Sequence, residues 1–516
     1  MSKNRNMSTN MLKQTFILTL VSAITLIVSF GKETIVAFFF GTTKVADAYT
    51  VAVEFPITLF SIVSVAISTV LIPMYLKILE NEGKLSAERY ASNLVTIVTV
   101  MGAVLLVFFE LFAEPLMKII APGLGEETLI LAKTLFRLLL PITMLTLIVN
   151  INTGISNSNK NYFFPSLTPN LLNIPIIVVA FSYAKKIGIY AVVWGTFLGI
   201  ILELIYSYII ASKYYHYKPY VDIKDKNIRL TIKLAVPTLI GTGAEELNKI
   251  VDRIFSSMLP AGSIASLNYG SKLSSGIYSL IIASMSVVAY SEFASAAARK
   301  DKKGLFAAFE FSNRIAILLL TPIVTGGILL SREIITLVFA RGAFTDKDAA
   351  FTAPIFAAYL VGLIFSAIRV TCCKYCYSLG DTKMPTKTTV LCVALNIPLN
   401  ALLSYKYGAC GLAWATTLSV AISTLTIFII ICRKYVKMNL RENGKFIIKI
   451  LICDIVMCVG ILVLKYFFSI KLTIIVRFFI QLFIGAILFV TMLFLLRIEE
   501  VEMVLKSVRK KRKNKL

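Results

Sequence analysis

The sequence predicts an all-α polytopic membrane protein with about fourteen transmembrane helices. Of its 516 residues, 57% are hydrophobic and 16% are charged, and the mean hydropathy is +0.81. Soluble domains carry roughly 25% charged residues, so one water-soluble core cannot enclose this much apolar surface. Apolar runs of about 20 residues, enough to cross a hydrocarbon core of about 30 Å, recur along the whole chain.

These runs define the predicted transmembrane helices, and no long soluble domain separates them. Four runs are long and contain proline or polar residues, so we expect them to tilt or break within the bilayer. The first run is too long for a signal peptide and is predicted to remain as the first span. In chain order the spans are 15–38, 47–78, 89–112, 127–152, 164–183, 188–211, 232–258, 264–295, 312–330, 351–377, 386–406, 409–431, 446–466 and 472–496.

The loops between these spans differ in their content of lysine and arginine. Cytoplasmic loops of membrane proteins carry more of both residues. The basic segments are the N-terminus, the loops at 77–89, 212–231, 299–303, 383–387 and 433–441, and the tail at 506–515. Both termini are therefore predicted to be cytoplasmic, which requires an even number of spans.

The polar loop at 212–231 predicts a division into two six-helix lobes. We place the N-terminal lobe at 1–220, the C-terminal lobe at 221–435, and two C-terminal helices with a basic cytoplasmic tail at 436–516. A weak internal repeat supports this division, because 45–49 and 264–268 each follow a short outer turn. Parallel repeats with a central site between them are typical of secondary transporters.

Composition also excludes several classes of function. The formal net charge of +25 largely reflects the cytoplasmic loops, so we expect contact with membrane lipids and no binding of nucleic acid. His216 is the single histidine, and no metal site is expected. We interpret Cys372-Cys-Lys-Tyr-Cys376 as small buried hydrophobes rather than as a redox motif. The chain lacks a P-loop and a GxSxG motif, so we expect no enzyme activity and no cofactor.

Charged residues inside the apolar spans are the candidate functional residues, because a charge near the bilayer centre costs roughly 2.5 to 3.5 kcal/mol. Lys32, Glu33 and Asp47 form the first cluster, on either side of the turn between the first two spans. A local ion pair costs less than isolated charges, so a purely structural role is one interpretation. Substrate binding or ion coupling is the other.

The second cluster lies in the seventh predicted span. It contains the acids Glu245, Glu246 and Asp252 together with Lys249 and Arg253. Helical spacing places acids and bases on shared faces, so mutual salt bridges are one interpretation. The other is a cavity wall or a site for a coupling cation, since carboxylates can hold sodium or protons.

Lys272 and Asn268 form the third cluster, early in the eighth span. A lysine whose long side chain reaches the membrane interface is the structural interpretation. Alternatively, Lys272 faces Lys32 across a central cleft, and two lysines from opposite halves clamp an anionic group such as a phosphate.

Seven short motifs occur in the order found in one transporter family. They are Gly31-Lys-Glu-Thr-Ile-Val-Ala37, Ala46-Asp-Ala-Tyr-Thr-Val-Ala52, Ile72-Pro73, Ala121-Pro-Gly-Leu124, Phe164-Pro-Ser-Leu-Thr-Pro-Asn-Leu-Leu-Asn173, Arg341-Gly-Ala-Phe-Thr345 and Tyr377-Ser-Leu-Gly-Asp-Thr-Lys-Met-Pro385. Each motif alone is weakly specific, but together they extend along nearly the entire chain. The sequence therefore resembles the MurJ/MviN lipid II flippases of the multidrug/oligosaccharidyl-lipid/polysaccharide exporter superfamily.

The resemblance implies a fold and a mechanism. The implied fold has fourteen spans in two lobes, a central cavity lined with cations, and a hydrophobic groove for a polyprenyl tail formed with the last two spans. In the implied mechanism, a lipid-linked disaccharide-pentapeptide enters from the cytoplasmic leaflet, basic residues hold its pyrophosphate, and alternating access releases it outside. The implied location is the bacterial cytoplasmic membrane, with cell-wall synthesis proteins as further partners.

The candidate residues can be matched to the family's motifs one by one. The four that match, with lysine in place of arginine at two of them, are Lys32, Glu33, Asp47 and Lys272. Leu26 and Phe60 stand where many members have further cavity arginines, and Ser271 replaces a common acid. The cavity is therefore expected to be less basic, with lysines as its basic groups.

The leading hypothesis is a flippase for a polyprenyl-pyrophosphate-linked saccharide, with the peptidoglycan precursor lipid II as its first candidate. One alternative is a flippase for another lipid-linked glycan, of the teichoic acid or capsular polysaccharide type. Others are a cation-coupled multidrug exporter and a polytopic glycosyltransferase or polymerase. The expected energy source is sodium, protons or the membrane potential, which provides about 2.3 kcal/mol per elementary charge per 100 mV.

The charge distribution makes a prediction about topology. In a background without reactive native cysteines, we expect thiol labelling of intact cells to modify Lys347→Cys, in an outer loop, and to spare Lys302→Cys, in a cytoplasmic one. Permeabilised cells should label both variants, which controls for the reactivity of each site. The reverse pattern in intact cells would overturn the orientation and with it the direction of transport.

Overall fold

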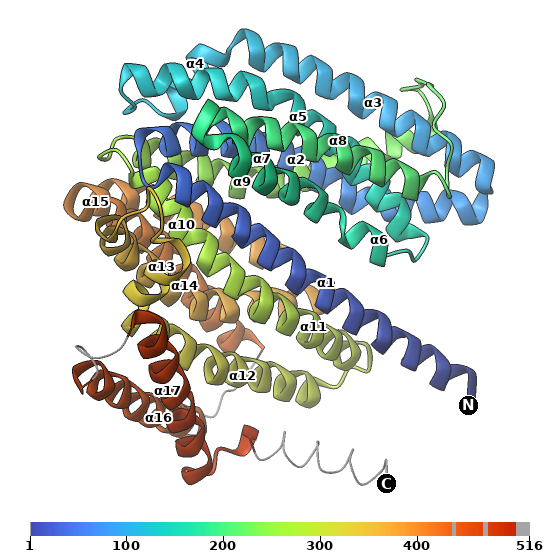
Figure 1. Cartoon of the computed structure of the whole chain (residues 1–516). Coiled ribbons are helices and arrows are strands. Elements are labelled where there is room, and N and C mark those ends of the chain that lie inside the picture. The colour runs from blue at the N-terminus through green and yellow to red at the C-terminus, as the bar shows by residue number, and fades with distance from the viewer. Residues whose placement is uncertain (1, 436–439, 468–472, 502–516) are drawn as a thin grey trace. The chain divides into compact units, whose positions relative to one another are not determined.

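The computed structural model consists of α-helices and one short π-helical turn, and the residues that it describes contain no strand (Figure 1). It describes residues 2–435, 440–467 and 473–501, with side chains from position 20 onward except at 237, 238, 240–242, 244, 245 and 440. Twelve helices within these ranges are long and apolar enough to cross a membrane. The predicted fold class, an all-α polytopic membrane protein, is confirmed.

The chain forms two compact units, the first from residues 1–265 with 341–344 and the second from 266–340 with the chain after 344. The helices of the first unit are α1 (Ser2–Phe40), α2 (Lys44–Asn81), α3 (Lys84–Leu111), α4 (Ala113–Ile120), α5 (Glu126–Ser158), α6 (Phe163–Ser166), α7 (Thr168–Ile187), α8 (Tyr190–Ala211) and α9 (Lys226–Ser257). The second unit follows with α10 (Ser263–Ile277), which begins at the border, η1 (Tyr278–Ile282), α11 (Ala283–Ala298), α12 (Lys302–Leu329), α13 (Ser331–Phe339), α14 (Asp346–Ser378), α15 (Lys383–Lys434), α16 (Leu440–Phe467) and α17 (Ile474–Leu495).

Two places account for the difference between the twelve candidate spans and the fourteen predicted ones. α15 runs through both spans predicted at 386–406 and 409–431, although Gly408 interrupts the helical geometry with a left-handed φ of 58°. α9 covers the span predicted at 232–258 but is not among the twelve, and seven of its side chains lie outside the described residues. The number fourteen therefore stays a prediction.

The division after residue 265 differs from the lobe boundary predicted at 220. α9 belongs to the first unit because it packs along α2 and contacts α4, and α16 and α17 belong to the second unit because they pack on α12. The predicted lobes 1–220 and 221–435 and the C-terminal segment 436–516 rest on a sequence repeat rather than on packing. They stay predictions.

Small residues allow the helices of the first unit to approach one another. α2 and α5 lie at its centre, where a Cβ at Gly154 would come within 2.5 Å of a methyl carbon of Leu71. A Cβ at Gly195 or Gly199 of α8 would meet the backbone of α7 at 2.7 Å or 2.5 Å. Within a membrane, helices associate through such close packing rather than through the hydrophobic effect.

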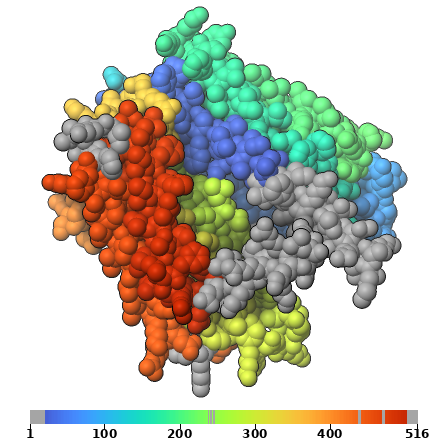
Figure 2. Space-filling view, turned by 60° about the horizontal axis from the view of Figure 1, so that its bottom comes forward, coloured from blue at the N-terminus to red at the C-terminus, as the bar shows by residue number. Residues whose placement is uncertain are grey.

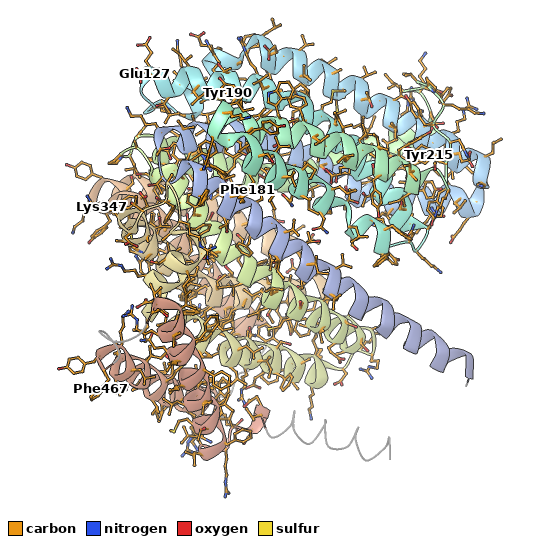
Figure 3. The ribbon with its side chains drawn as sticks, in the orientation of Figure 1. Glu127, Phe181, Tyr190, Tyr215, Lys347 and Phe467 are labelled. Carbon is orange, nitrogen blue, oxygen red and sulfur yellow. The ribbon has the colours of Figure 1, made fainter. Side chains whose placement is uncertain are left out.

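The segment between α8 and α9 is folded onto α3. Asn93 of α3 donates from Nδ2 to the carbonyl of Asp222 at 2.9 Å and accepts the backbone N–H of Asp222 at 2.9 Å. Figure 3 shows Tyr215 of this segment at the opposite end of the first unit from Glu127 and Tyr190, which lie at the starts of α5 and α8. α5 and α8 therefore run in the same direction, as the alternation of the predicted spans requires.

Arg314 of α12 joins three segments of the second unit. Its guanidinium donates to Oδ1 of Asn443 in α16 at 2.9 Å and pairs with Glu310, one turn earlier, at 2.9 Å. It also pairs with Glu500, which follows α17, at 2.9 Å. Glu500 is 2% exposed. Loss of Arg314 would therefore leave the buried carboxylate of Glu500 without a compensating positive charge. This network holds the α16 and α17 pair against α12.

The cysteine motif lies in the core of the second unit. Cys372 and Cys376 are fully buried in an apolar cluster that includes Phe293, Phe309 and Tyr375. All eight cysteines are free thiols in this structure. The interpretation of Cys372 and Cys376 as small buried hydrophobes is confirmed.

Candidate functional site

Lys32 and Glu33 of α1 form an ion pair with 3.0 Å between Nζ and Oε1. Glu33 is buried, and 20% of the Lys32 side chain is exposed. The pair balances two charges within an apolar helix, as the structural interpretation requires. An ammonium group has three donors, however, so Lys32 retains the capacity to bind a second acceptor. Pairing and anion binding are therefore compatible.

Asp47, in the first turn of α2, holds the turn that leads into α10. Its Oδ2 accepts the backbone N–H of Gly262 at 2.5 Å, and its Oδ1 accepts that of Ala265 at 2.8 Å. The first N–H groups of a helix have no partner within the helix, so this carboxylate caps α10. Gly262 has a φ of 88°, and a Cβ there would collide with the carbonyl of Thr42. Both oxygens of Asp47 thus hold backbone, which favours a positioning role over direct contact with substrate.

A polar cavity of about 210 Å³ lies beside Asp47 in the first unit. Ser256 and Ser257, at the end of α9, contribute buried hydroxyls, and Oγ of Ser257 accepts the N–H of Gly123 at 3.2 Å. The polar side chains of its lining are those of Lys44, Asp47, Thr128, Ser256 and Ser257. Apart from Asp47, these residues were missed by the sequence analysis, because serine and threonine in a span carry no distinctive spacing.

α9 carries the second cluster, and its bases have two kinds of partner. Lys249 donates to Oε1 of Glu246 at 2.9 Å within the helix. Arg253 instead pairs with Glu54 of α2. The local salt bridge agrees with one of the two interpretations of this cluster, but the bridge to α2 was missed. An acid deep in the apolar second span, in addition to Asp47 at its edge, was the available signal for Glu54.

The predicted coupling role of the three acids in α9 stays a prediction. Oε2 of Glu246 is buried and has no hydrogen-bond partner in the described part of the chain. Asp252 is half-buried farther along the same helix. The side chain of Glu245 lies outside the described residues.

Lys272 and Asn268 lie one turn apart on α10, in the second unit, and therefore share a face of the helix. Lys272 is exposed. Oδ1 of Asn268 is enclosed and accepts no hydrogen bond from the residues that the structure describes. Tyr269, on the neighbouring face, is buried with its ring 5.0 Å from that of Phe339. The predicted clamp between Lys272 and Lys32, which belongs to the first unit, stays a prediction.

The second unit contains an apolar cavity of about 750 Å³. Its walls come mainly from α12, α14, α16 and α17, and Figure 2 shows α16 and α17, in red, at the surface of the unit. Glu500 is the charged residue of the lining, and Arg314 already pairs with it. Apolar lining residues include Pro322, Gly326, Phe356, Met457, Phe478 and Phe489. The cavity lies where the family resemblance implies a groove formed with the last two spans.

Relatives of known family match nearly the whole chain. The model of the family "Lipid II flippase MurJ" matches residues 36–511. The probable lipid II flippase MurJ of Buchnera aphidicola subsp. Acyrthosiphon pisum is 25% identical over 473 residues, which cover 89% of this chain and 91% of that protein. The probable lipid II flippase MurJ of Thermotoga maritima is 26% identical over 502 residues, which cover 96% and 98%.

Solved structures from this family and from a related transporter are also similar to this chain. The structure of "Lipid II flippase MurJ, inward closed conformation" has a TM-score of 0.79 at 26% identity and covers 92% of this chain and 98% of that chain. An inward-facing multidrug resistance MATE family transporter of the MOP superfamily has a TM-score of 0.67 and covers 79% and 93%. Its identity is 14%, so this likeness shows a shared fold alone.

Substitution of Asp47 separates positioning from substrate binding. Its removal leaves two buried N–H groups unsatisfied, at about 1 to 3 kcal/mol each. We expect Asp47→Ala to lower the melting temperature of the purified protein and to reduce transport, and Asp47→Asn, which keeps one acceptor oxygen, to have smaller effects. Asp346→Ala, at the exposed start of α14, is the control. Lost transport with unchanged melting temperature would instead make Asp47 a substrate ligand.

Proposed function

The chain belongs to the lipid II flippase MurJ family, and from this premise we propose that it translocates lipid II from the inner to the outer leaflet of the bacterial cytoplasmic membrane. Lipid II is a polyprenyl-pyrophosphate-linked saccharide and the precursor of peptidoglycan. The family match over residues 36–511 is the observation that carries the proposal. The proposed mechanism is alternating access, with both termini of the chain in the cytoplasm.

The apolar cavity of the second unit is the proposed site for the polyprenyl tail. Its volume of about 750 Å³ lies within the range of about 300 to 1,000 Å³ typical of ligand pockets. The tail would enter this cavity from a bilayer interior that is as apolar as its walls, so close packing rather than the hydrophobic effect stabilises it there. A hydrocarbon chain needs no polar partner in these walls. The single carboxylate in these walls that could bind a cationic drug is that of Glu500, which already forms an ion pair with Arg314.

The lysines are the proposed contacts for the pyrophosphate. Without substrate, Lys32 pairs with Glu33. A phosphate oxygen that binds another N–H of the Lys32 ammonium leaves the pair with Glu33 in place, so neither charge becomes isolated in the membrane. Lys272 is the proposed second contact, with Asn268 on the same face of α10. Lysine binds phosphate as a point charge, whereas arginine forms a bidentate fork.

Transport in this proposal leaves the substrate chemically unchanged. Proteins of cell-wall synthesis that consume lipid II at the outer surface are the proposed partners, because their reaction removes the transported product. The chain lacks a nucleotide-binding motif, so we propose that the energy comes from sodium, protons or the membrane potential.

Depletion of the protein tests the substrate and the lysines together. We expect lipid II to accumulate on the inner leaflet, as identified by mass spectrometry and by its protection from reagents added outside. The wild-type chain should clear it, and Lys32→Ala or Lys272→Ala should not, because the pyrophosphate loses a cation. The corresponding Lys→Arg variants should retain activity, since arginine keeps the charge and adds a phosphate-matching fork.

Two comparisons complete this experiment. Lys84→Ala is the matched control, since it removes an exposed lysine that pairs locally with Glu88 on α3. All variants should be present at near-normal abundance. If a different lipid-linked glycan accumulates, that glycan and not lipid II is the substrate. If both alanine variants clear lipid II as well as the wild type does, the proposed clamp between Lys32 and Lys272 is wrong.

Filling the apolar cavity tests the site of the tail. A Cβ at Gly326 would have one neighbour within 4 Å, a methyl carbon of Met457 at 3.8 Å. Gly326→Phe should therefore occupy the cavity without displacing backbone. In proteoliposomes we expect it to slow a long-tailed lipid II more than an analogue with a short isoprenoid. Gly444→Phe is the control, because a Cβ there meets nothing within 4 Å. Equal rates for wild type and Gly326→Phe with the long tail would contradict this assignment.

Neutralising the acids of α9 tests the energy source. Glu246 has an oxygen without a hydrogen-bond partner in the described chain, which makes it the first candidate for a coupling ion. We expect Glu246→Gln, Asp252→Asn or Glu245→Gln to weaken transport or to alter its dependence on sodium, pH or membrane potential. Wild-type behaviour of all three variants under all three conditions would reduce the cluster to structural salt bridges.

A further inference from the structure

Glu203 is a buried carboxyl group to which the proposed transport route assigns no role. It lies between Tyr190 and Ala211, the ends of α8, inside a helix apolar enough to span the membrane. Only 7% of its surface is exposed. Across the ranges that the structure describes, Glu203 makes no hydrogen bond and no ion pair. Glu203 is the single acid of the sixth predicted span, and this signal in the sequence was missed.

Neighbouring residues of α8 show which helices enclose Glu203. Gly199, one turn earlier, lies against Leu172 of α7. Ser207, one turn later, accepts a hydrogen bond of 3.2 Å from Asn152 of α5. Residues four apart share a face of a helix, so Glu203 lies on the face of α8 that packs against α5 and α7. Packing within the first unit therefore covers almost the whole Glu203 side chain.

The charged residues of the surrounding helices do not offset the charge of Glu203. Lys133 and Arg137 of α5 pair with Glu114 and Glu110, respectively. α6, which also packs on α8, has no titratable residue. The remaining titratable residues of α5, α7 and α8 are Glu126, Glu127, Tyr183, Lys185, Lys186, Tyr190, Tyr206 and Tyr208. The acids and lysines among them lie at the start of α5 and the end of α7, far along the helices from Glu203.

A carboxylate in such a place would be an isolated charge. Burial of an ionised group without a partner costs far more than burial of the neutral acid. We propose that Glu203 is a proton-binding site, occupied in the present arrangement of α5, α7 and α8 and emptied when α8 moves against its neighbours during transport. The site is distinct from the acids of α9, which lie on another helix.

Polar side chains begin at Ser207, one turn along α8 from Glu203, and continue toward one end of the first unit. The hydroxyl of Tyr215 donates to Oδ1 of Asn152 at 2.7 Å, and Asn152 in turn donates to Ser207. Burial raises the pKa of Tyr215, so its hydroxyl stays protonated and can donate this hydrogen bond. Toward the start of α8, Gly199 packs so closely on α7 that an added Cβ would come within 2.5 Å of the carbonyl oxygen of Leu172. The proton is therefore expected to exchange from the end that carries Tyr215 (Figure 3), which is the predicted cytoplasmic end.

Labelling with dicyclohexylcarbodiimide tests proton binding in the purified full-length protein. This apolar reagent reacts with protonated carboxyl groups in apolar surroundings, and peptide mass spectrometry locates the adduct. We expect an adduct at Glu203 whose yield falls as the pH rises, and no adduct at that position in Glu203→Gln. Glu110, with 45% of its side chain exposed and paired with Arg137, is the internal control. Absence of the adduct at acidic, neutral and alkaline pH would overturn the proposal.

Transport in proteoliposomes tests whether the proton leaves. When pH is varied on the side of Tyr215, Glu203→Gln should lose the pH dependence that the wild type shows, because an amide cannot titrate. Glu203→Asp should keep a pH dependence with a shifted midpoint, and Glu110→Gln should match the wild type. A profile of Glu203→Gln identical to that of the wild type would mean that the proton stays bound, which would overturn the proposal.

If Glu203→Gln does not fold, the aspartate variant decides the question. A profile of Glu203→Asp with no shift from the wild type would then count against release of the proton. The transport measurement rests on the proposed function, whereas the labelling does not. Failure of lipid II as the substrate would therefore leave the labelling result intact, and the two failures remain distinguishable.

Discussion

A charge within the membrane needs a partner, and this requirement organises both compact units. Lys32 pairs with its neighbour Glu33, and Arg253 of α9 pairs with Glu54 of α2. Arg314 joins α12 to the chain after α17 through Glu500. Breaking a buried pair leaves one uncompensated charge, at about 3 to 5 kcal/mol, so the pairs of Arg253 and Arg314 also stabilise the packing of the segments that they join.

The same requirement limits how an anionic substrate can cross the membrane. A free lysine in an apolar helix would be costly while the transporter is empty. Lys32 avoids that cost through Glu33, and the remaining donors of its ammonium can bind a pyrophosphate while Glu33 stays paired. Asp47 supports this arrangement from the neighbouring helix, because it holds the turn into α10 through two backbone N–H groups. Glu203 departs from the rule, and a bound proton removes its charge in the absence of a partner.

Each unit has a different chemical character. The first unit contains a polar cavity beside Asp47 and the lysine of the proposed clamp on α1. The second unit contains the larger, apolar cavity between α12 and the α16 and α17 pair. A lipid with a charged head and a long hydrocarbon tail needs both kinds of surface. The proposed substrate is consistent with this division.

The sequence by itself determined the membrane class, the helical architecture and the spans whose charges require an explanation. Those properties depend on composition and on local spacing, and so the pairs Lys32 with Glu33 and Glu246 with Lys249 could be anticipated. Only the tertiary structure decided the partners of Asp47 and Arg253, and it alone showed that Glu203 is enclosed. These features arise from contacts between helices that are far apart in the chain. The spacing of residues along one helix carries no information about which side chain of another helix will lie against it.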